Sequence, residues 1–277
     1  YIGGSLYTWT SIIGVVLAGI SLGNYLGGRI ADRYSRPVVL GAVFLAAGVA
    51  SLAILPGVAL LAKTPIPNSV HLMSRSLIYS ALMFFVPTTI LGMITPLVIK
   101  LTLQDLGRTG NVVGTIYAVS TVGAIVGTFA TGFWLVSWFG TRTIVWLVAA
   151  VLLLLGIMVG SLWKSPRRGA VVGGVLLLYV LLFLARGSFQ DTFLKESNYY
   201  AIKVWDITDD KGKPVRALTL DRIVHSYASL DDPTYLSYPY EKIFAQFAAY
   251  QSQKSPQVRA LFIGGGGYTL PRYMEVA

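Results

Sequence analysis

The chain has 277 residues, of which 55% are hydrophobic and only 12% charged, whereas a soluble domain carries about 25% charged residues, so a purely soluble protein is excluded. The net charge of +10 arises in residues 1–186, which hold 12 Lys and Arg against two acids, while residues 187–277 hold ten of each, so we expect no nucleic acid partner. With no cysteine and only two histidines, disulfides and thiolate metal sites are excluded and no metal site is expected.

Apolar stretches recur throughout residues 1–186. Each is near the roughly 20 residues that a helix needs to span the hydrocarbon core of a bilayer. We therefore predict a transmembrane helical domain with five or six spans, placing the protein in a lipid bilayer as an integral protein of a bacterial inner or plasma membrane. The predicted spans are 7–26, 38–62, 77–99, 112–139 and 143–163, followed by a short apolar segment at 170–185.

Basic residues are unevenly divided between the connections. Eight of them follow the first, third and fifth spans, and three lie in the opposite connections, so the first set is expected in the cytoplasm. The eight are Arg29, Arg33, Arg36, Lys100, Arg108, Lys164, Arg167 and Arg168.

The connection after the first span contains Gly28, Asp32, Arg33 and Arg36. It resembles the cytoplasmic signature loop of major facilitator transporters, Gly-x-x-x-Asp-Arg-x-Gly-Arg. The resemblance implies a charged latch between helices with Asp32 as its buried member. A basic loop with one balancing acid explains the same residues without a function.

A weak repeat of small residues links the first and fourth spans. Glycines at 19, 23 and 28 recur 104 residues later at 123, 127 and 132. Glycines four residues apart allow helices to approach closely, so helix packing is one reading, and a transport pathway between repeated halves is the other. No charged residue lies at the middle of any span, which does not favour an independent pump.

The chain changes to the composition of a soluble α/β protein after Gly187. Residues 199–208 and 215–221 are predicted to form a β-hairpin around the turn at 209–214. Residues 240–250 are predicted to form an amphipathic helix, and residues 260–263 a short buried strand. The apolar face of this helix consists of Ile243, Phe244, Phe247 and Ala248.

Four consecutive glycines, Gly264, Gly265, Gly266 and Gly267, follow the predicted strand and precede a helical pattern. Glycine permits a tight turn and a close approach of a ligand to the backbone, and the following helix amino terminus favours anionic groups. The loop is therefore a candidate cofactor-binding turn, with a flexible connector as the alternative.

Four sequence elements of the tail occur together in a recognisable order, and this order resembles the amino-terminal part of spermidine synthases, the polyamine aminopropyltransferases. The match is closer to members that carry several transmembrane helices before the synthase-like domain. The elements are Glu196-Ser197-x-Tyr199, Arg216-x-Leu218-x-Leu220-Asp221, Tyr240-Glu241, and Leu261-Phe262-Ile263-Gly264-Gly265-Gly266.

The resemblance implies a truncated Rossmann-like methyltransferase fold behind the membrane domain. Its expected parts are a transmembrane domain at 1–186, a β-hairpin and linking helix at 187–255, and the first strand and glycine loop at 256–277. It also implies an S-adenosylmethionine-type donor, decarboxylated or ordinary, bound at the glycine loop, and an amine or polyamine acceptor. The family's catalytic Asp is expected beyond Ala277, so we expect this fragment to be inactive.

Several residues depart from the family pattern. Tyr200, Arg222 and His225 stand where the family has Gln, Gly and Gln, and Gly267 replaces an Asp that grips the donor's amine. The candidates for the substrate pocket are Tyr200, Asp221, His225, Tyr240 and Glu241. Structural roles compete for three of them: turn capping for Asp221, a dipole contact for Glu241 and a polar strand position for His225.

The expected function is a membrane-anchored, spermidine synthase-like transferase. The alternative is a major-facilitator-like transporter or scaffold with a non-catalytic, nucleoside-sensing tail. A cytoplasmic tail is expected because the donor is cytoplasmic, yet a fully spanning segment at 170–185 would place it outside. Three alternatives would resolve this conflict: a re-entrant or interfacial segment, a miscounted earlier span, or an external domain with some other ligand. Hairpin edges could pair protomers into a homo-oligomer.

Overall fold

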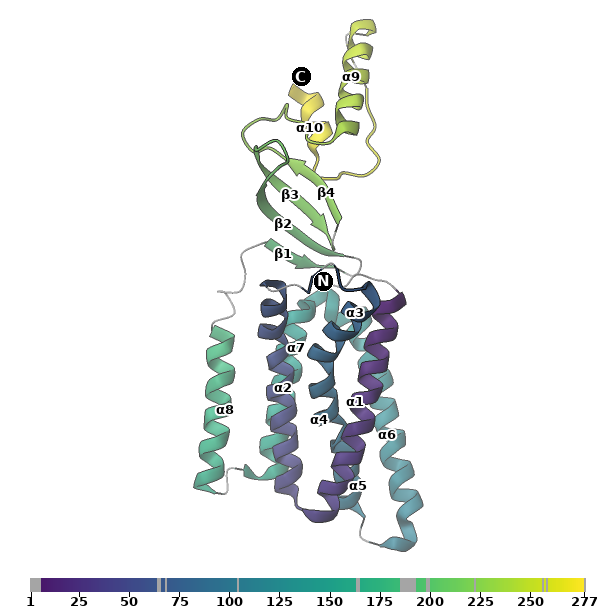
Figure 1. Cartoon of the computed structure of the whole chain (residues 1–277), viewed down its shortest axis with the longest axis vertical. Helices are drawn as coiled ribbons and strands as arrows, with labels where there is room; N and C mark the ends of the chain where they lie inside the picture. Colours follow the sequence, from purple (N-terminus) through teal and green to yellow (C-terminus); the bar gives the residue numbers. More distant parts are fainter. Residues whose placement is uncertain are drawn as a thin grey trace. The chain divides into compact units, whose positions relative to one another are not determined.

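A computed structural model describes most of the chain, and the chain divides into two units, Tyr1–Phe189 and Gln190–Ala277 (Figure 1). Each unit has its own set of internal contacts. The described residues are 6–63, 66–67, 69–103, 105–162, 165–184, 193–197, 200–221, 223–255, 257 and 259–276.

The first unit is built from long apolar helices, as predicted. Five continuous helical runs in the described residues are long and apolar enough to cross a membrane. The run Leu106–Gly160 contains two of the predicted spans, because Gly140 at φ 73° and ψ 160° leaves the helical conformation between them. That backbone conformation is accessible almost only to glycine. The helices are α1 Leu6–Arg33, α2 Pro37–Lys63, α3 Leu72–Ser80, η1 Ala81–Phe85, α4 Val86–Gly92, α5 Ile94–Thr102, η2 Leu106–Arg108, α6 Thr109–Ala130, η3 Thr131–Leu135, α7 Val136–Gly160 and α8 Pro166–Leu184.

Small residues bring two pairs of helices into close contact. A Cβ at Gly41 of α2 would lie 2.5 Å from the Gly160 Cα of α7, and one at Gly92 of α4 would lie 2.8 Å from the Ile20 carbonyl oxygen of α1. A Cβ at Gly23 would collide with the carbonyl of Thr89. Close backbone approach of this kind is the usual means by which helices associate in lipid, where water does not drive them together.

The predicted glycine repeat is packed in only one of its copies. On α1 the packed positions are Gly19, Gly23 and Gly27, whereas Gly28 has open space around it. The second copy on α6, at Gly123 and Gly127, has no described neighbour within 4 Å of an added Cβ. The α1 stripe therefore serves helix packing.

The last helix of this unit runs antiparallel to α7. Near its start, Val172 and Val175 pack with Leu153 and Leu162, and further along the Tyr179 hydroxyl donates to the Trp146 carbonyl at 3.4 Å. The rings of Trp146 and Tyr179 meet edge to face with centroids 5.2 Å apart. The helix α8 thus crosses from one end of the unit towards the other.

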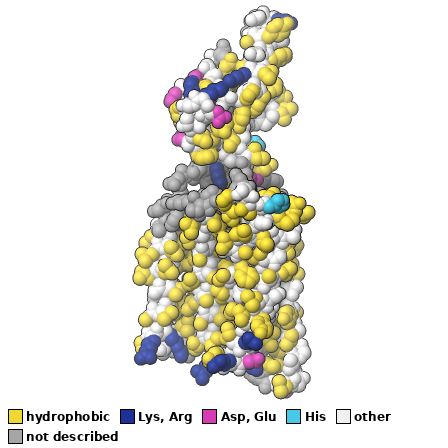
Figure 2. All heavy atoms as spheres, in the orientation of Figure 1, with side chains coloured by type: hydrophobic (Ala, Val, Ile, Leu, Met, Phe, Trp, Pro, Cys, Tyr) yellow, Lys and Arg dark blue, Asp and Glu magenta, His cyan; other side chains and the backbone are white. Residues whose placement is uncertain are grey.

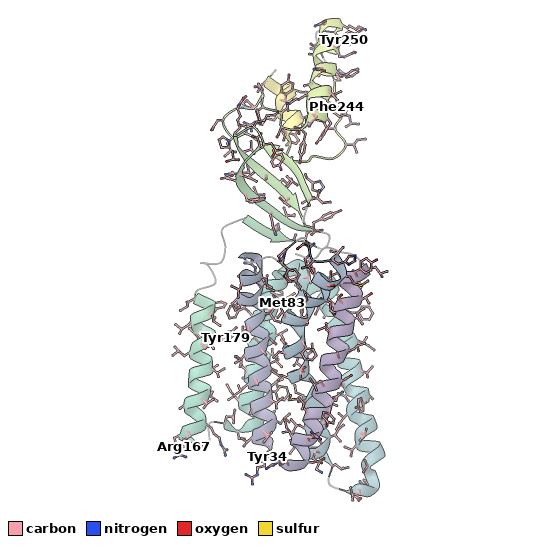
Figure 3. The ribbon with its side chains drawn as sticks, in the orientation of Figure 1. Tyr34, Met83, Arg167, Tyr179, Phe244 and Tyr250 are labelled. Atoms are coloured by element: carbon pink, nitrogen blue, oxygen red, sulfur yellow. The ribbon has the colours of Figure 1, made fainter. Side chains whose placement is uncertain are left out.

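Basic side chains gather at one end of this unit, as expected from the connections (Figure 2). Tyr34, after α1, and Arg167, at the start of α8, lie at that same end (Figure 3). The Lys100 ammonium of α5 contacts the Asp32 carboxylate of α1 at 3.1 Å, which ties two of the basic connections together.

The second unit holds a four-stranded antiparallel sheet in the order β1-β2-β3-β4 and two helices. The predicted hairpin is confirmed, since β2 pairs with β3 around a turn in which the Asp209 carboxylate accepts from the amides of Lys211 and Lys213, both at 3.0 Å. Along β3, Val215, Ala217 and Thr219 alternate as buried residues. The elements are β1 Phe193–Glu196, β2 Ala201–Thr208, β3 Pro214–Leu220, β4 Ile223–Ala228, α9 Pro239–Lys254 and α10 Thr269–Val276.

Two expectations for this unit were wrong. Residues 260–263 form no strand, and Leu261 and Ile263 are 88% and 95% exposed. A buried strand of a parallel sheet needs a neighbouring strand, and none of the described strands lies beside this segment. The helix α9 is present, but its expected core face is exposed at Ile243, Phe244 and Phe247, and Ala245 is buried instead. The Rossmann-like fold is therefore not part of what the structure shows.

Candidate functional site

The glycine loop is a tight turn that leads directly into α10. Gly264 and Gly266 have φ values of 86° and 50°, in the left-handed region that glycine tolerates best. The Tyr268 amide donates to the Gly265 carbonyl at 2.8 Å, and the Arg272 amide donates to the Tyr268 carbonyl at 3.1 Å. The loop therefore has a defined, hydrogen-bonded conformation.

The loop and α10 are fixed to the edge strand β4. The Thr269 hydroxyl donates to the Tyr227 carbonyl at 3.4 Å, and the Arg272 guanidinium donates to the Ser229 carbonyl at 2.9 Å. Ser226 is 3% exposed, and its hydroxyl has no partner among the described residues. An added Cβ at Gly267 would collide with this hydroxyl. The contact between Gly267 and Ser226 thus holds the end of the loop against the sheet.

The two ends of the loop differ in the space around them. Added Cβ atoms at Gly264 and Gly265 would meet no atom within 4 Å, so a ligand can approach the backbone there. At Gly267 an added Cβ would lie 2.0 Å from the Ser226 hydroxyl oxygen, so a side chain there would require Ser226 to move.

Stacked aromatic rings connect β4 with the start of α9. The ring of Tyr238 lies between those of Tyr227 and Tyr240, with centroid distances of 5.3 and 5.5 Å, and its hydroxyl donates to the Val224 carbonyl at 3.2 Å. Burial raises the pKa values of Tyr238 and Tyr240. Tyr240 is 50% exposed, so it can take part in a binding surface. Tyr238 was not predicted as a site residue, because no sequence pattern separates it from its tyrosine neighbours.

Two of the predicted pocket residues close the sheet instead. The Asp221 carboxylate accepts from the Ala201 amide, and the Asp221 amide donates to the Ala201 carbonyl, both at 2.9 Å. The Tyr200 amide donates to the Ser197 hydroxyl at 3.0 Å. These contacts give Asp221 the turn-capping role that competed with a catalytic one.

Glu241 also has a structural role. It is 3% exposed, and its carboxylate accepts from the Tyr238 amide at 3.2 Å, which caps the amino terminus of α9. Burial raises the pKa of this carboxyl, while the hydrogen bonds from the backbone of Tyr238 and Ser237 act in the opposite direction. The Glu241 carboxylate is therefore buried and held at the amino terminus of α9 by the Tyr238 amide.

The backbone of His225 lies beside the glycine loop. The pairing of β3 with β4 passes from Leu218 with Ser226 to Thr219 with Val224, so His225 is the extra residue of a β-bulge. Its carbonyl oxygen lies 4.0 Å from an added Cβ at Gly266. The bulge shapes the strand beneath the loop, and the imidazole is exposed.

The membrane signature loop differs from the expected buried latch. The Asp32 side chain is 77% exposed and pairs with Lys100, not with an arginine of its own loop. The Arg33 guanidinium lies over the Tyr34 ring, 5.5 Å from its centroid. Arg36 follows α1 in the short connection to α2, and Gly28 faces open space. The exposure of Asp32 corrects the expectation that it is the buried member of a latch. An exposed ion pair of this kind contributes little to stability.

The comparisons with known proteins gave no match: no family model, no curated protein and no solved structure is similar to this chain. In the described residues, no group of three His, Cys, Asp or Glu side chains is arranged to hold a metal ion. A functional assignment therefore depends on the glycine loop, the strand beneath it and the sequence elements that resemble the spermidine synthases.

Proposed function

We propose that the tail binds a nucleoside thioether of the S-adenosylmethionine type at the glycine loop, within a membrane-anchored protein similar to the spermidine synthases. The observation that carries this proposal is the open backbone at Gly264 and Gly265 in a loop that Gly267 and Ser226 fix to the sheet. A glycine backbone with open space beside it is suited to a ligand that must approach the backbone closely. The exposed ring of Tyr240 is a candidate for stacking on a base.

Calorimetry with methylthioadenosine, on the full chain in detergent, tests this binding. Gly265→Val adds a side chain where no protein atom lies within 4 Å and where φ is not positive, so it should block the ligand without disturbing the fold. We expect binding to the wild type and at least about a tenfold loss in the variant, since a single clash in a small site removes a few kcal/mol. No binding to the wild type, or equal binding to both, would overturn the proposal.

Aminopropyl transfer is the first candidate for the step after binding. Transfer to an amine requires a base that accepts the amine's proton, and the described contacts of Asp221 and Glu241 keep both carboxylates occupied. Transfer by the protein would therefore need another carboxylate. Formation of methylthioadenosine from decarboxylated S-adenosylmethionine and a diamine would establish this candidate.

A non-catalytic sensing tail on a membrane scaffold is the second candidate. It is favoured by the occupied carboxylates and by the absence of space for an acid at position 267. Under this candidate, methylthioadenosine binds and no product forms. Uptake of labelled polyamine into sealed vesicles would then assign a transport role to the helical unit.

A further inference from the structure

A second concave surface in the tail lies apart from the glycine loop. It is an open groove of about 450 Å³ between the β2–β3 turn, the connection from β4 to α9, and the helices α9 and α10. None of its lining residues belongs to the glycine loop. The lining residues are Lys211, Asp232, Thr234, Tyr235, Leu236, Lys242, Ala245, Gln246, Ala249 and Tyr273.

The carboxylates in and beside the groove are already paired. The Asp209 carboxylate accepts from the Tyr235 hydroxyl, and the Asp232 carboxylate accepts from the Thr234 hydroxyl at 2.6 Å and from the Lys213 ammonium at 3.2 Å. The Tyr235 hydroxyl is the largest cause of the lowered pKa of Asp209, and the Thr234 hydroxyl of that of Asp232. Both acids are therefore ionised and internally satisfied at neutral pH.

Two lysines of the groove are in a different situation. Lys211 comes from the hairpin turn and Lys242 from the first turns of α9, and neither forms an ion pair with a carboxylate of the described residues. The nearby Lys211 ammonium is the largest cause of a lowered pKa of Lys242, which the charge of Asp209 partly offsets. Two ammonium groups facing one groove repel each other, and a bound anion would remove that repulsion.

We propose that this groove binds a phosphate group, held between the ammonium groups of Lys211 and Lys242. Two cations match a phosphate dianion better than a single carboxylate, and lysine binds phosphate as a point charge. The Gln246 amide is a further donor in the lining, and Ala245, Ala249 and Tyr273 supply an apolar wall for the rest of the ligand. On the face of the tail drawn in Figure 2, Lys and Arg side chains lie close to Asp and Glu side chains.

Titration of the full chain in detergent with inorganic phosphate and glycerol phosphate tests the site by calorimetry. Lys211→Met and Lys242→Met should each weaken binding by about tenfold, because each removes one charged hydrogen-bond donor. Lys254→Met is the matched control on the same helix, since its ammonium lies over the Tyr250 ring at 4.4 Å and does not line the groove. The affinity of Lys254→Met for phosphate should equal that of the wild type, and added salt should weaken phosphate binding to both proteins.

A thermal measurement guards against misfolded variants. Without phosphate, Lys242→Met should melt no lower than the wild type, because it removes a repulsion. With phosphate, the melting temperature should rise for the wild type and for Lys254→Met, and not for the groove variants. No phosphate effect on the wild type, or an equal effect on all variants, would overturn the proposal.

A second measurement, with lipids as ligands, decides whether the bound phosphate belongs to a lipid headgroup or to a soluble phosphate ester. Short-chain phosphatidic acid is compared with diacylglycerol of the same chain length, using native mass spectrometry. Tighter binding of phosphatidic acid than of glycerol phosphate, lost in Lys242→Met, assigns a lipid headgroup. Binding of the soluble phosphates alone assigns a free phosphate ester. Methylthioadenosine binding should be unchanged in Lys242→Met, which separates this site from the glycine loop.

Discussion

Gly267 and Ser226 form the contact on which the shape of the glycine loop depends. An added Cβ at position 267 would overlap the Ser226 hydroxyl and lie 3.0 Å from the Ser226 Cβ. Since Ser226 belongs to a strand, it has little freedom to move away. The hydroxyl is buried without a described partner, which is a cost that close packing of the glycine offsets.

Gly267→Ala should therefore destabilise the tail by about 1–3 kcal/mol, the usual cost of inserting a methyl group into a packed contact. Gly265→Ala is the matched control, because its surroundings are open. Hydrogen exchange of the α10 amides would measure the stability of the tail in both variants. Ser226→Gly should restore part of the loss in the Gly267→Ala background, and equal protection in the two alanine variants would show that the contact is unimportant.

Glu241 should make the stability of the tail dependent on pH. Burial raises its folded pKa above the ordinary 4.5, so between these two values the folded protein binds more protons than the unfolded chain. The favourable contribution is fully present below 4.5 and is lost as the pH rises through the folded pKa. Glu241→Gln keeps an acceptor for the Tyr238 amide and removes the charge.

We expect the Gln variant to unfold at a higher temperature than the wild type at pH 7 and to lose this dependence. Thermal unfolding followed by exchange of the α9 amides, at several pH values above 4.5, would measure it. Asp209 and Asp232 have lowered pKa values, so their protonation affects stability only at lower pH, in a separate transition. Parallel pH profiles for the two proteins would exclude Glu241 as the source.

The helices α1 and α6 have similar glycine spacing and different surroundings. On α1, Gly23 faces the backbone of α4, whereas on α6 the corresponding Gly127 has no described neighbour within 4 Å. Spacing alone shows that a close approach is possible. Which helix uses it depends on what lies opposite.

Gly23→Leu should strongly reduce the thermal stability of the full chain in detergent, by about 2–4 kcal/mol, because the side chain would separate α1 from α4. Gly127→Leu is the control at the repeated position and should have little effect. Scanning fluorimetry would compare them. An equal loss in both would show that the α6 face is also covered in the assembled protein, as a homo-oligomer would require.

For the protein as a whole, α8 decides the side of the membrane on which the tail lies. With 19 residues it extends about 28 Å, close to the thickness of the hydrocarbon core, and its side chains contact Leu162, just after α7, and Trp146 of α7. It begins at the basic end of the unit (Figure 3). A complete crossing of the bilayer by α8 would place the tail opposite the basic connections, and the cytoplasmic tail expected from the donor stays a prediction.

Because the chain contains no cysteine, single cysteines can report this directly. Asp231→Cys, exposed in the tail, should react with a membrane-impermeant maleimide in intact cells. Ser35→Cys, in the basic connection between α1 and α2, should react only after permeabilisation. The reverse pattern would place the tail in the cytoplasm and favour the transferase over the sensing tail.

Much of the architecture follows from local composition and periodicity. The apolar segments, the break at Gly140 within α7, the hairpin and α9 were predicted correctly, because lipid requires helices and because turn residues such as Asp209 act on their own neighbours. Burial that depends on contacts between segments far apart in the chain was not predicted correctly. Residues 260–263 have the composition of a buried strand, yet no described strand pairs with them.

The sites depend on contacts between residues far apart in the chain. Neither the close contact of Gly267 with Ser226 nor the meeting of Lys211 with Lys242 in one groove is visible in the order of the residues. A sequence specifies which side chains can pack, cap or repel. Which of them meet is set by the arrangement of the strands and helices, since packing free energy depends on neighbours in space.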